Sequence, residues 1–248
     1  MLCNVMAPDM LELMETGSPG DIDFYSQYAR HRGGPVLALL SGTGRIALAI
    51  ARMGVPVVGV DPDPARIDLA KRKAQAIGAS RAMFVRADPT NFVSESRHPL
   101  VIIPGGLGRL VSLEEQRQAL LAVRSALAAG GRLVLDLPLL DMGPSPSGQP
   151  AVHYQFGDAG RTAVIQRYRQ FEAARQLVHE TISCEWLGED GRVESKSYAT
   201  CTERYATPAE VQLLLEISGF AVTSYGGFDR TPLLPGATRL VIEAERRT

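Results

Sequence analysis

The sequence has no large excess of charge of either sign and no long hydrophobic run, and each shortage excludes a class of protein. Lys and Arg together number 26 against 27 Asp and Glu, which gives a formal net charge of -1. Nucleic acids and membrane surfaces usually select a basic partner, so this balance argues against both and favours a small-molecule partner. No apolar run approaches the ~18 residues that a membrane helix needs, and Pro8, Asp9 and Glu12 interrupt the N-terminal stretch where a signal peptide has its apolar core. We therefore expect a cytoplasmic protein without a membrane partner.

Cysteine is also scarce. Cys3, Cys184 and Cys201 are far apart and form no C-x-x-C pair. This spacing suggests neither a disulfide framework nor a zinc site, and we expect no bound metal. A chain of 248 residues can bury enough apolar surface for a large α/β domain, with or without an insertion, and needs no covalent staple.

The stretch from Pro35 to Asp61 predicts a strand, a glycine turn, a helix and a second strand. Continuous apolar runs are typical of buried parallel strands, and a helix normally connects two such strands. The glycines at positions 42 and 44 allow a sharp turn and a close approach to a ligand. Asp61 ends the second strand, where a carboxylate can hold a ribose diol. With Ala47, the spacing also matches the dinucleotide pattern G-x-G-x-x-[GA], so a nucleoside site is expected.

The remaining pattern alternates helices with strands and completes an open sheet. Capping residues at positions 63, 112 and 207 predict helix starts, and glycines at 78, 130 and 219 predict helix or turn ends. Helices are expected at about 21–31, 64–77, 113–129 and 208–218, and further strands at about 82–86, 100–103, 132–137, 220–225 and 238–244.

Between these segments the composition changes. Residues 138–150 are rich in Pro, Gly and Ser, and residues 151–205 alternate with period two, which predicts about four antiparallel strands. The expected fold is α/β, a Rossmann-like doubly wound sheet of about seven strands with an antiparallel β meander inserted after the fifth strand. We expect an N-terminal helical lid at 1–34, a core at 35–140 and 206–248, and an insertion at 141–205 that covers the substrate or forms a homodimer contact.

Four segments together resemble the class I S-adenosylmethionine-dependent methyltransferases. They are PVLALLSGTGRIALAIARMGVPVVGVD, FVRADPTNF, LVIIPGGLGRLVSLEEQRQALLAVRSALAAGGRLVLDL and RYATPAEVQLLLEISGF. The chain looks most like the small-molecule branch that modifies sugars, amines and secondary metabolites, including antibiotics. The resemblance implies S-adenosylmethionine as cofactor, S-adenosylhomocysteine as product, and a small-molecule acceptor methylated at nitrogen or oxygen.

The resemblance also implies roles for particular residues. The glycine turn would lie under the methionine and ribose, Asp61 would accept hydrogen bonds from both ribose hydroxyls, and Asp88 would accept one from the adenine amine. The implied cofactor-binding set is Tyr25, Leu40, Ser41, Gly42, Thr43, Gly44, Asp61, Pro62, Arg66, Ala87, Asp88, Pro104 and Gly105. Structural alternatives stay open: Asp61 and Asp88 each precede a proline and suit Asx turns, and Tyr25 suits core packing as well as a lid.

Two residues depart from the family pattern near the glycine turn. Ala38 replaces an acid in the first strand, and Leu40 replaces the first glycine of the turn. A methyltransferase-like protein that binds S-adenosylmethionine without methylating is therefore an alternative, as is a nicotinamide oxidoreductase.

Candidates for acid or base chemistry are few. Arg109 stands where many relatives have a histidine, and His153 and Tyr154 open the insertion, where they can face a substrate. His98 is expected in a surface loop, and His179 on the solvated face of a strand.

Overall fold

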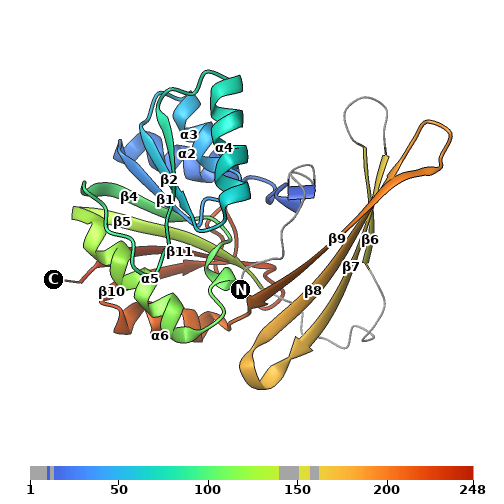
Figure 1. Ribbon diagram of the computed structural model, residues 1–248. Coiled ribbons are helices and arrows are strands. Elements are labelled where there is room, and N and C mark those ends of the chain that lie inside the picture. The colour runs from blue at the N-terminus through green and yellow to red at the C-terminus, as the bar shows by residue number, and fades with distance from the viewer. Residues whose placement is uncertain (1–9, 12–13, 140–150, 157–161, 248) are drawn as a thin grey trace. The chain divides into compact units, whose positions relative to one another are not determined.

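The computed structural model describes residues 10–11, 14–139, 151–156 and 162–247. The chain divides into two compact units. One comprises residues 17–140 and 206–248 and carries a seven-stranded sheet, and the other comprises residues 1–16 and 141–205 and carries a four-stranded sheet (Figure 1).

The seven-stranded sheet has the order β10-β11-β5-β4-β1-β2-β3. Its strands are β1 (Val36–Leu39), β2 (Val57–Asp61), β3 (Ala82–Arg86), β4 (His98–Ile103), β5 (Leu127–Pro138), β10 (Phe220–Tyr225) and β11 (Arg239–Arg246). The first five are mutually parallel, and β11 runs antiparallel to both β5 and β10. The predicted Rossmann-like sheet is confirmed. The strand order reverses between β1 and β4, and ligands of open α/β sheets bind outside the carboxyl ends of strands at such a point.

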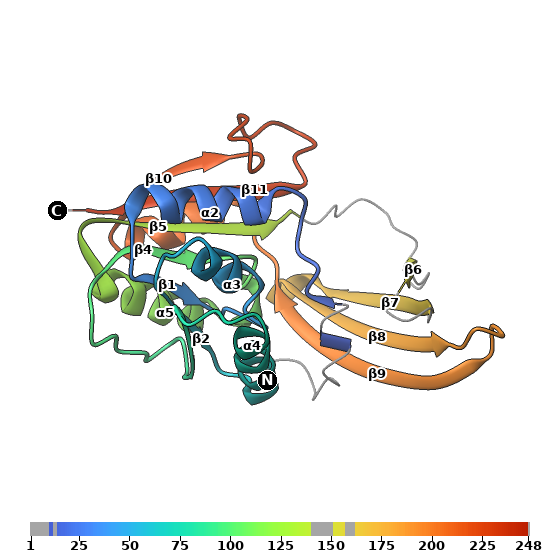
Figure 2. The same ribbon diagram turned by 90° about the horizontal axis from the view of Figure 1, so that it is seen from above.

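Helices cover both faces of this sheet. They are α2 (Asp21–Arg32), α3 (Arg45–Arg52), α4 (Pro64–Ala76), α5 (Leu113–Ala126) and α6 (Pro208–Ile217). Figures 1 and 2 show these helices on the two faces of the sheet. Leu37 and Leu39 of β1 belong to the core cluster with α5 and α6, whereas Val36 and Ala38 belong to the cluster with α2, α3 and α4. Because both faces of β1 are buried, the strand is apolar throughout.

The helix starts follow the predicted caps. The Asp63 side chain accepts a hydrogen bond from the backbone of Ala65, and Ser112 and Glu115 form a full capping box. The end of α5 differs from the prediction: the helix stops at Ala126 and β5 begins at Leu127, which pairs with His98 of β4. That pairing depends on the neighbouring strand, so local sequence does not reveal it.

The second unit holds β6 (Ala151–Phe156), β7 (Thr162–Glu172), β8 (Leu177–Leu187) and β9 (Val193–Arg204), paired antiparallel in that order. The predicted antiparallel meander after β5 is confirmed. Ile182, Cys184 and Trp186 lie two residues apart along β8, and all three are buried. The cysteine spacing suggested no disulfide framework, but Cys201 in β9 is disulfide-bonded. Disulfide partners meet in space, and their spacing along the chain does not reveal them.

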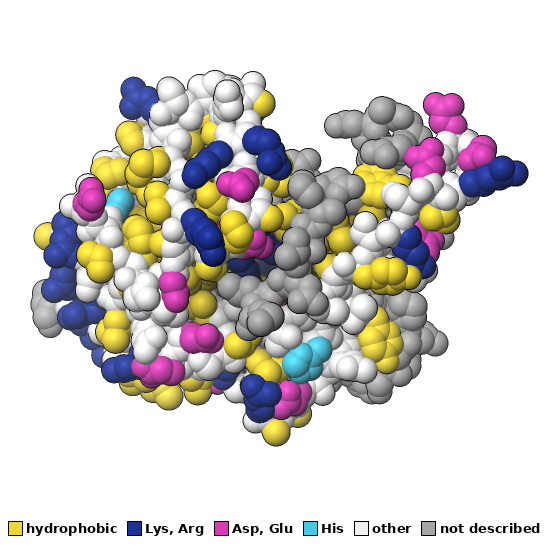
Figure 3. Space-filling view, viewed as in Figure 1, with side chains coloured by type: hydrophobic (Ala, Val, Ile, Leu, Met, Phe, Trp, Pro, Cys, Tyr) yellow, Lys and Arg dark blue, Asp and Glu magenta, His cyan; other side chains and the backbone are white. Residues whose placement is uncertain are grey.

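The surface reflects the balanced composition. Acidic and basic side chains lie among one another on the face in Figure 3. In the described part of the chain, no helix is long and apolar enough to cross a membrane.

Candidate functional site

The carboxyl ends of β1, β2, β4 and β5 bring four loops to one edge of the seven-stranded sheet. Leu40 follows β1, Asp61 ends β2, Gly105 follows β4 and Asp136 lies near the end of β5. Parallel strands place these ends together, and the reversal of strand order separates the loops after β1 and β4. This edge is the candidate site.

The glycine turn after β1 is held by backbone hydrogen bonds and by packing. The Ser41 amide donates to the Val60 carbonyl at 3.0 Å, and the Gly44 amide donates to the Ser41 carbonyl at 3.1 Å. Gly44 has a φ of 82°, and a Cβ there would come within 2.6 Å of the Phe84 ring. Both conditions require glycine at position 44.

Leu40 adopts the left-handed backbone conformation, with a φ of 55°. This is the position at which the family pattern has its first glycine, and a side chain in this conformation costs about 1–3 kcal/mol. The Leu40 side chain is buried in the core. It lies so close to the loop after β4 that a Cβ on Gly106 would come within 2.8 Å of the Leu40 Cβ.

Asp61 is completely buried and bonded to the backbone on both sides. Its Oδ2 accepts a hydrogen bond from the Gly42 amide at 2.9 Å, and its Oδ1 accepts one from the Asp63 amide at 3.1 Å. The second contact is the Asx turn that the sequence left open. The first contact ties the end of β2 to the glycine turn.

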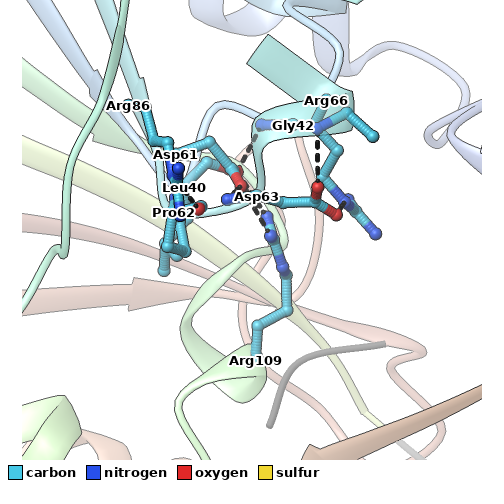
Figure 4. Close-up of polar contacts among 9 residues, drawn as sticks. Leu40, Gly42, Asp61, Pro62, Asp63, Arg66, Arg86 and Arg109 are labelled. Atoms are coloured by element: carbon cyan, nitrogen blue, oxygen red, sulfur yellow. Dashed lines mark hydrogen bonds and ion pairs between the residues drawn. The ribbon is translucent and has the colours of Figure 1, made fainter. Parts of the chain in front are cut away.

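Arg109 completes the coordination of the same carboxylate (Figure 4). It belongs to the short helix η1 (Leu107–Arg109), and its Nη1 and Nη2 donate to Asp61 Oδ2 and Oδ1 at 2.8 and 3.0 Å. Nη1 also donates to the Leu40 carbonyl at 3.4 Å. Burial is the largest single effect and raises the pKa of the Asp61 carboxyl, but the Arg109 guanidinium, Arg66 and the Asp63 amide together hold that pKa below its ordinary value. The pair is therefore an ionised, two-pronged salt bridge.

Other implied residues surround this pair. Arg66 is buried, and its Nε forms an ion pair with Asp63 Oδ2 at 3.3 Å. The Pro62 carbonyl accepts a hydrogen bond from Arg86 Nε at 3.4 Å, and the Ala87 amide donates to the Asp61 carbonyl at 3.2 Å.

Asp88 and Thr43 lie at opposite extremes of exposure. Asp88 is exposed, and its Oδ1 accepts hydrogen bonds from the Thr90 amide at 2.9 Å and the Thr90 hydroxyl at 2.7 Å. The turn interpretation of Asp88 is thus present in the structure. Thr43 is buried within the glycine turn.

Asp136 is a buried carboxylate that the sequence analysis missed. Its Oδ1 accepts hydrogen bonds from the Tyr25 hydroxyl at 2.6 Å and the Gly105 amide at 3.0 Å, and its Oδ2 pairs with the Arg239 guanidinium. Burial raises the pKa of Asp136, although Arg239, Tyr25 and Gly105 all act to lower it. One signal was available: Asp136 is a lone acid within the apolar strand sequence LVLDL, and a carboxylate there is buried only with partners.

The Ser41 hydroxyl and the space beside Gly105 are two further features of this edge. The Ser41 Oγ is buried and has no hydrogen-bond partner among the residues that the structure describes. Gly105 is exposed after β4 and faces open space, because the nearest atom to a Cβ placed there is Asp136 Oδ2 at 4.0 Å. Pro104 precedes it and is half-buried.

His98 lies at the start of β4, at the opposite end of that strand from this edge. His98 is buried in β4, with Nδ1 donating to the Pro35 carbonyl at 2.9 Å and Nε2 bonded to the Ser94 hydroxyl at 2.7 Å. The expectation of a surface loop is therefore wrong, because His98 pairs with β5 and replaces solvent by two internal partners. His179 bonds to Thr202 and Glu172 on the four-stranded sheet.

His153 and Tyr154 lie in β6, and their side chains are outside the described part of the structure. Within the described ranges, no group of three or more His, Cys, Asp and Glu side chains is placed to hold a metal ion.

Comparisons with known proteins agree with this geometry. A family model described as a methyltransferase domain matches residues 36–131, which contain the glycine turn, Asp61 and Arg109. A solved S-adenosylmethionine-dependent methyltransferase from Clostridium acetobutylicum has a TM-score of 0.79 at 15% identity, covering 97% of this chain and 96% of that chain.

Two further solved structures are similar over nearly their whole length. A sugar N-methyltransferase from Streptoalloteichus has a TM-score of 0.74 at 18% identity, covering 98% of this chain and 94% of that chain. An amino pentose methyltransferase from Micromonospora echinaspora, solved with S-adenosylmethionine bound, has a TM-score of 0.74 at 17% identity, covering 99% and 98%. The matched domain favours a methyltransferase over a nicotinamide enzyme. Residues 36–131 therefore match a methyltransferase domain, and the chain has the fold of these solved methyltransferases, the class that its sequence resembles.

Proposed function

We propose that this enzyme transfers the methyl group of S-adenosylmethionine to a nitrogen or oxygen of a small molecule in secondary metabolism, such as antibiotic biosynthesis. The observation that carries the proposal is the buried Asp61 carboxylate beside the glycine turn, at the sheet edge where ligands of this fold class bind. The similar sugar N-methyltransferase and the amino pentose methyltransferase, which is named for calicheamicin biosynthesis, support a small-molecule acceptor.

The residues at this edge fit the cofactor, with one condition. Asp61 would hold the ribose hydroxyls, and the glycine turn from Ser41 to Gly44 would lie beneath the ribose and methionine, where the buried Ser41 Oγ offers an unused hydrogen-bonding group. Asp88 would hold the adenine amine. The condition is that the Arg109 guanidinium, which now bonds both oxygens of Asp61, must leave them.

The chain's own contribution to the reaction is positioning. The bound cofactor supplies a methyl group activated by its sulfonium charge. An in-line displacement requires the acceptor atom to be held about 3–3.5 Å from its target, and such alignment supplies several kcal/mol. Pro104 and Gly105 would form the wall beside the acceptor, because Gly105 leaves open space there.

Asp136 is the polar group best placed to orient an acceptor next to Gly105. Its Oδ1 is taken by Tyr25 and Gly105, and its Oδ2 pairs with Arg239 and lies toward the open side of Gly105. A carboxylate oxygen can accept a second hydrogen bond, so Oδ2 would accept one from an acceptor N–H or O–H. An amine acceptor must be the free base to attack, and a hydroxyl benefits from a base. His153 and Tyr154 remain our candidates for that base.

We further propose that the four-stranded sheet serves as a substrate cover or a homodimer contact and that the enzyme acts in the cytoplasm. A sheet with one apolar face packs against a second surface, and Ile182, Cys184 and Trp186 form such a face on β8.

Isothermal titration calorimetry with S-adenosylhomocysteine tests the cofactor site. We expect the native enzyme to bind, Asp61→Ala to lose binding, and Asp68→Ala, an exposed carboxylate on α4, to bind normally. Absence of binding to the native enzyme would contradict the proposal. Transfer of labelled methyl to a panel of amino sugars and phenols then identifies the acceptor atom.

A further inference from the structure

The carboxylate of Asp61 has no acceptor position left for a ligand. Each oxygen accepts one backbone N–H, from Gly42 or Asp63, and one guanidinium N–H from Arg109. An ionised carboxylate offers about four acceptor positions. A ribose diol therefore cannot add to this arrangement, and it can bind only where one of the present donors leaves.

The backbone donors are fixed, so the guanidinium is the one that can leave. The Gly42 amide belongs to the glycine turn and the Asp63 amide to the start of α4. The backbone of η1 is also held, because Gln116 Nε2 donates to the carbonyls of Leu107 and Leu110 at 3.2 and 2.9 Å. Release therefore requires a rotation of the Arg109 side chain and no movement of its loop.

Because the Arg109–Asp61 ion pair is largely buried, moving the guanidinium away from the carboxylate costs free energy. The side chains of Arg109 and Asp61 are 11% and 0% exposed. Exposed ion pairs contribute little because water screens them, whereas a buried carboxylate that loses its partner is left uncompensated. A ligand must supply two hydroxyl donors to replace the two guanidinium contacts.

We propose that Arg109 is an intramolecular competitor for the ribose position, so that the resting enzyme is autoinhibited and the cofactor binds only when the guanidinium leaves Asp61. This inference rests on the proposed role of Asp61 in holding the ribose. It assigns Arg109 a regulatory function at the cofactor site in place of a role in acid or base chemistry.

A neighbouring arginine provides a matched control. Arg86 lies next to the same loop, but its Nε donates to the Pro62 carbonyl and its side chain is exposed (Figure 4). Replacing Arg86 removes the same charge from the same edge without freeing the Asp61 carboxylate. A general electrostatic effect would therefore appear in both variants, whereas competition would appear only at position 109.

The test measures binding of S-adenosylhomocysteine and of methylthioadenosine by calorimetry to the native enzyme, Arg109→Gln and Arg86→Gln. Methylthioadenosine shares the adenine and ribose and lacks the amino-acid end. If the guanidinium of Arg109 has left Asp61 in only a minor fraction of the native molecules, removing it raises the apparent affinity for the ligand by the inverse of that fraction. We expect Arg109→Gln to bind both ligands about tenfold or more tightly, and Arg86→Gln to match the native enzyme.

The outcomes separate this inference from the proposed function. Equal affinity of the native enzyme and Arg109→Gln would overturn the competition and leave the cofactor site standing. Weaker binding by Arg109→Gln would also overturn it and make Arg109 a ligand of the cofactor. Absence of binding by all three proteins would overturn both. If Arg109→Gln does not fold, Arg109→Lys replaces it, since one ammonium cannot form both guanidinium contacts and intermediate tightening is then expected.

Discussion

The Tyr25 hydroxyl donates a 2.6 Å hydrogen bond to Oδ1 of Asp136, across 111 positions of the chain. The bond joins α2 to the carboxyl end of β5, and Tyr25 is completely buried. Burial, together with the neighbouring Asp136 carboxylate, raises the pKa of Tyr25 well above its ordinary value, so the phenol keeps its proton and remains a donor. Helix α2 is therefore bonded directly to the buried carboxylate beside Gly105.

Replacing Tyr25 by phenylalanine removes this donor and leaves the ring in place. Hydrogen bonds to charged groups contribute about 1.5–3 kcal/mol, so we expect Tyr25→Phe to lower the free energy of unfolding by about that amount. Urea denaturation measures the loss. Tyr225→Phe, at the half-buried end of β10, is the control and should change stability little. Equal effects of the two substitutions would show that the bond to Asp136 is not stabilising.

His98 predicts a pH dependence of stability near neutrality. Burial lowers the pKa of His98 below its ordinary value of 6.5, and only the bond to the Pro35 carbonyl opposes this. The folded state therefore resists protonation, while the unfolded state takes up a proton as the pH falls below about 6.5. The stability that neutral, buried His98 contributes is fully present above that pH. It decreases as the pH falls toward the lower pKa that His98 has in the folded state.

Urea denaturation at pH 7.5 and pH 5.5 tests this sign. We expect the native enzyme to lose stability at the lower pH, and His98→Asn to lose less between the same two values. His31→Gln, an exposed histidine at the end of α2, should behave like the native enzyme. The interpretation is wrong if the native enzyme and His98→Asn show the same change.

Most of the fold could be predicted because its signals are local. The Ser112 and Glu115 capping box, the Asp63 cap and the apolar runs of β1 and β2 each depend on neighbouring residues. The position of Asp61 at the end of β2 followed from the same pattern. These features required no knowledge of which strands are adjacent.

The contacts that define the site could not be predicted in the same way. Arg109 meets Asp61 across 48 positions, and Asp136 meets Tyr25 and Arg239 from two other segments. Strand order brings these groups together, and no periodicity encodes the partner of a particular side chain. His98 was misjudged for this reason, since its partners Pro35 and Ser94 meet it only after β4 enters the sheet.

Gly106 and Leu40 should be energetically coupled. Gly106 has a φ of -95°, which alanine adopts freely, so any cost of Gly106→Ala is steric. The new Cβ would come within 2.8 Å of the Leu40 Cβ and 3.4 Å of the Leu40 carbonyl oxygen. We expect Gly106→Ala to destabilise the enzyme by about 1–3 kcal/mol, as overpacking usually does.

A double-mutant cycle isolates this contact. Leu40→Gly relieves the left-handed backbone but removes a buried side chain, which typically costs about 2–5 kcal/mol. In the Leu40→Gly background, Gly106→Ala should cost much less than in the native enzyme. Additive free energies would contradict the close approach of the two residues.

Arg239 should stabilise the folded state mainly by compensating the buried charge of Asp136. The side chains of Arg239 and Asp136 are 21% and 3% exposed. Removing one partner of a buried ion pair leaves the other uncompensated and costs about 3–5 kcal/mol, so Arg239→Met should destabilise strongly.

Adding Asp136→Asn to Arg239→Met removes the unpaired charge and should recover part of the lost stability. Arg239→Met also removes the group that most opposes the effect of burial on Asp136, so the pKa of that carboxyl should rise further. When folding raises the pKa of a carboxyl, the protein loses stability as the pH rises from the pKa of that group in the unfolded state to its pKa in the folded state. Arg239→Met should therefore be less destabilised at pH 5 than at pH 7.5, and Asp136→Asn should abolish that difference. A loss that is independent of pH and is not relieved by Asp136→Asn would mean that Arg239 acts through packing, for example against the Phe228 ring that it contacts at 5.4 Å.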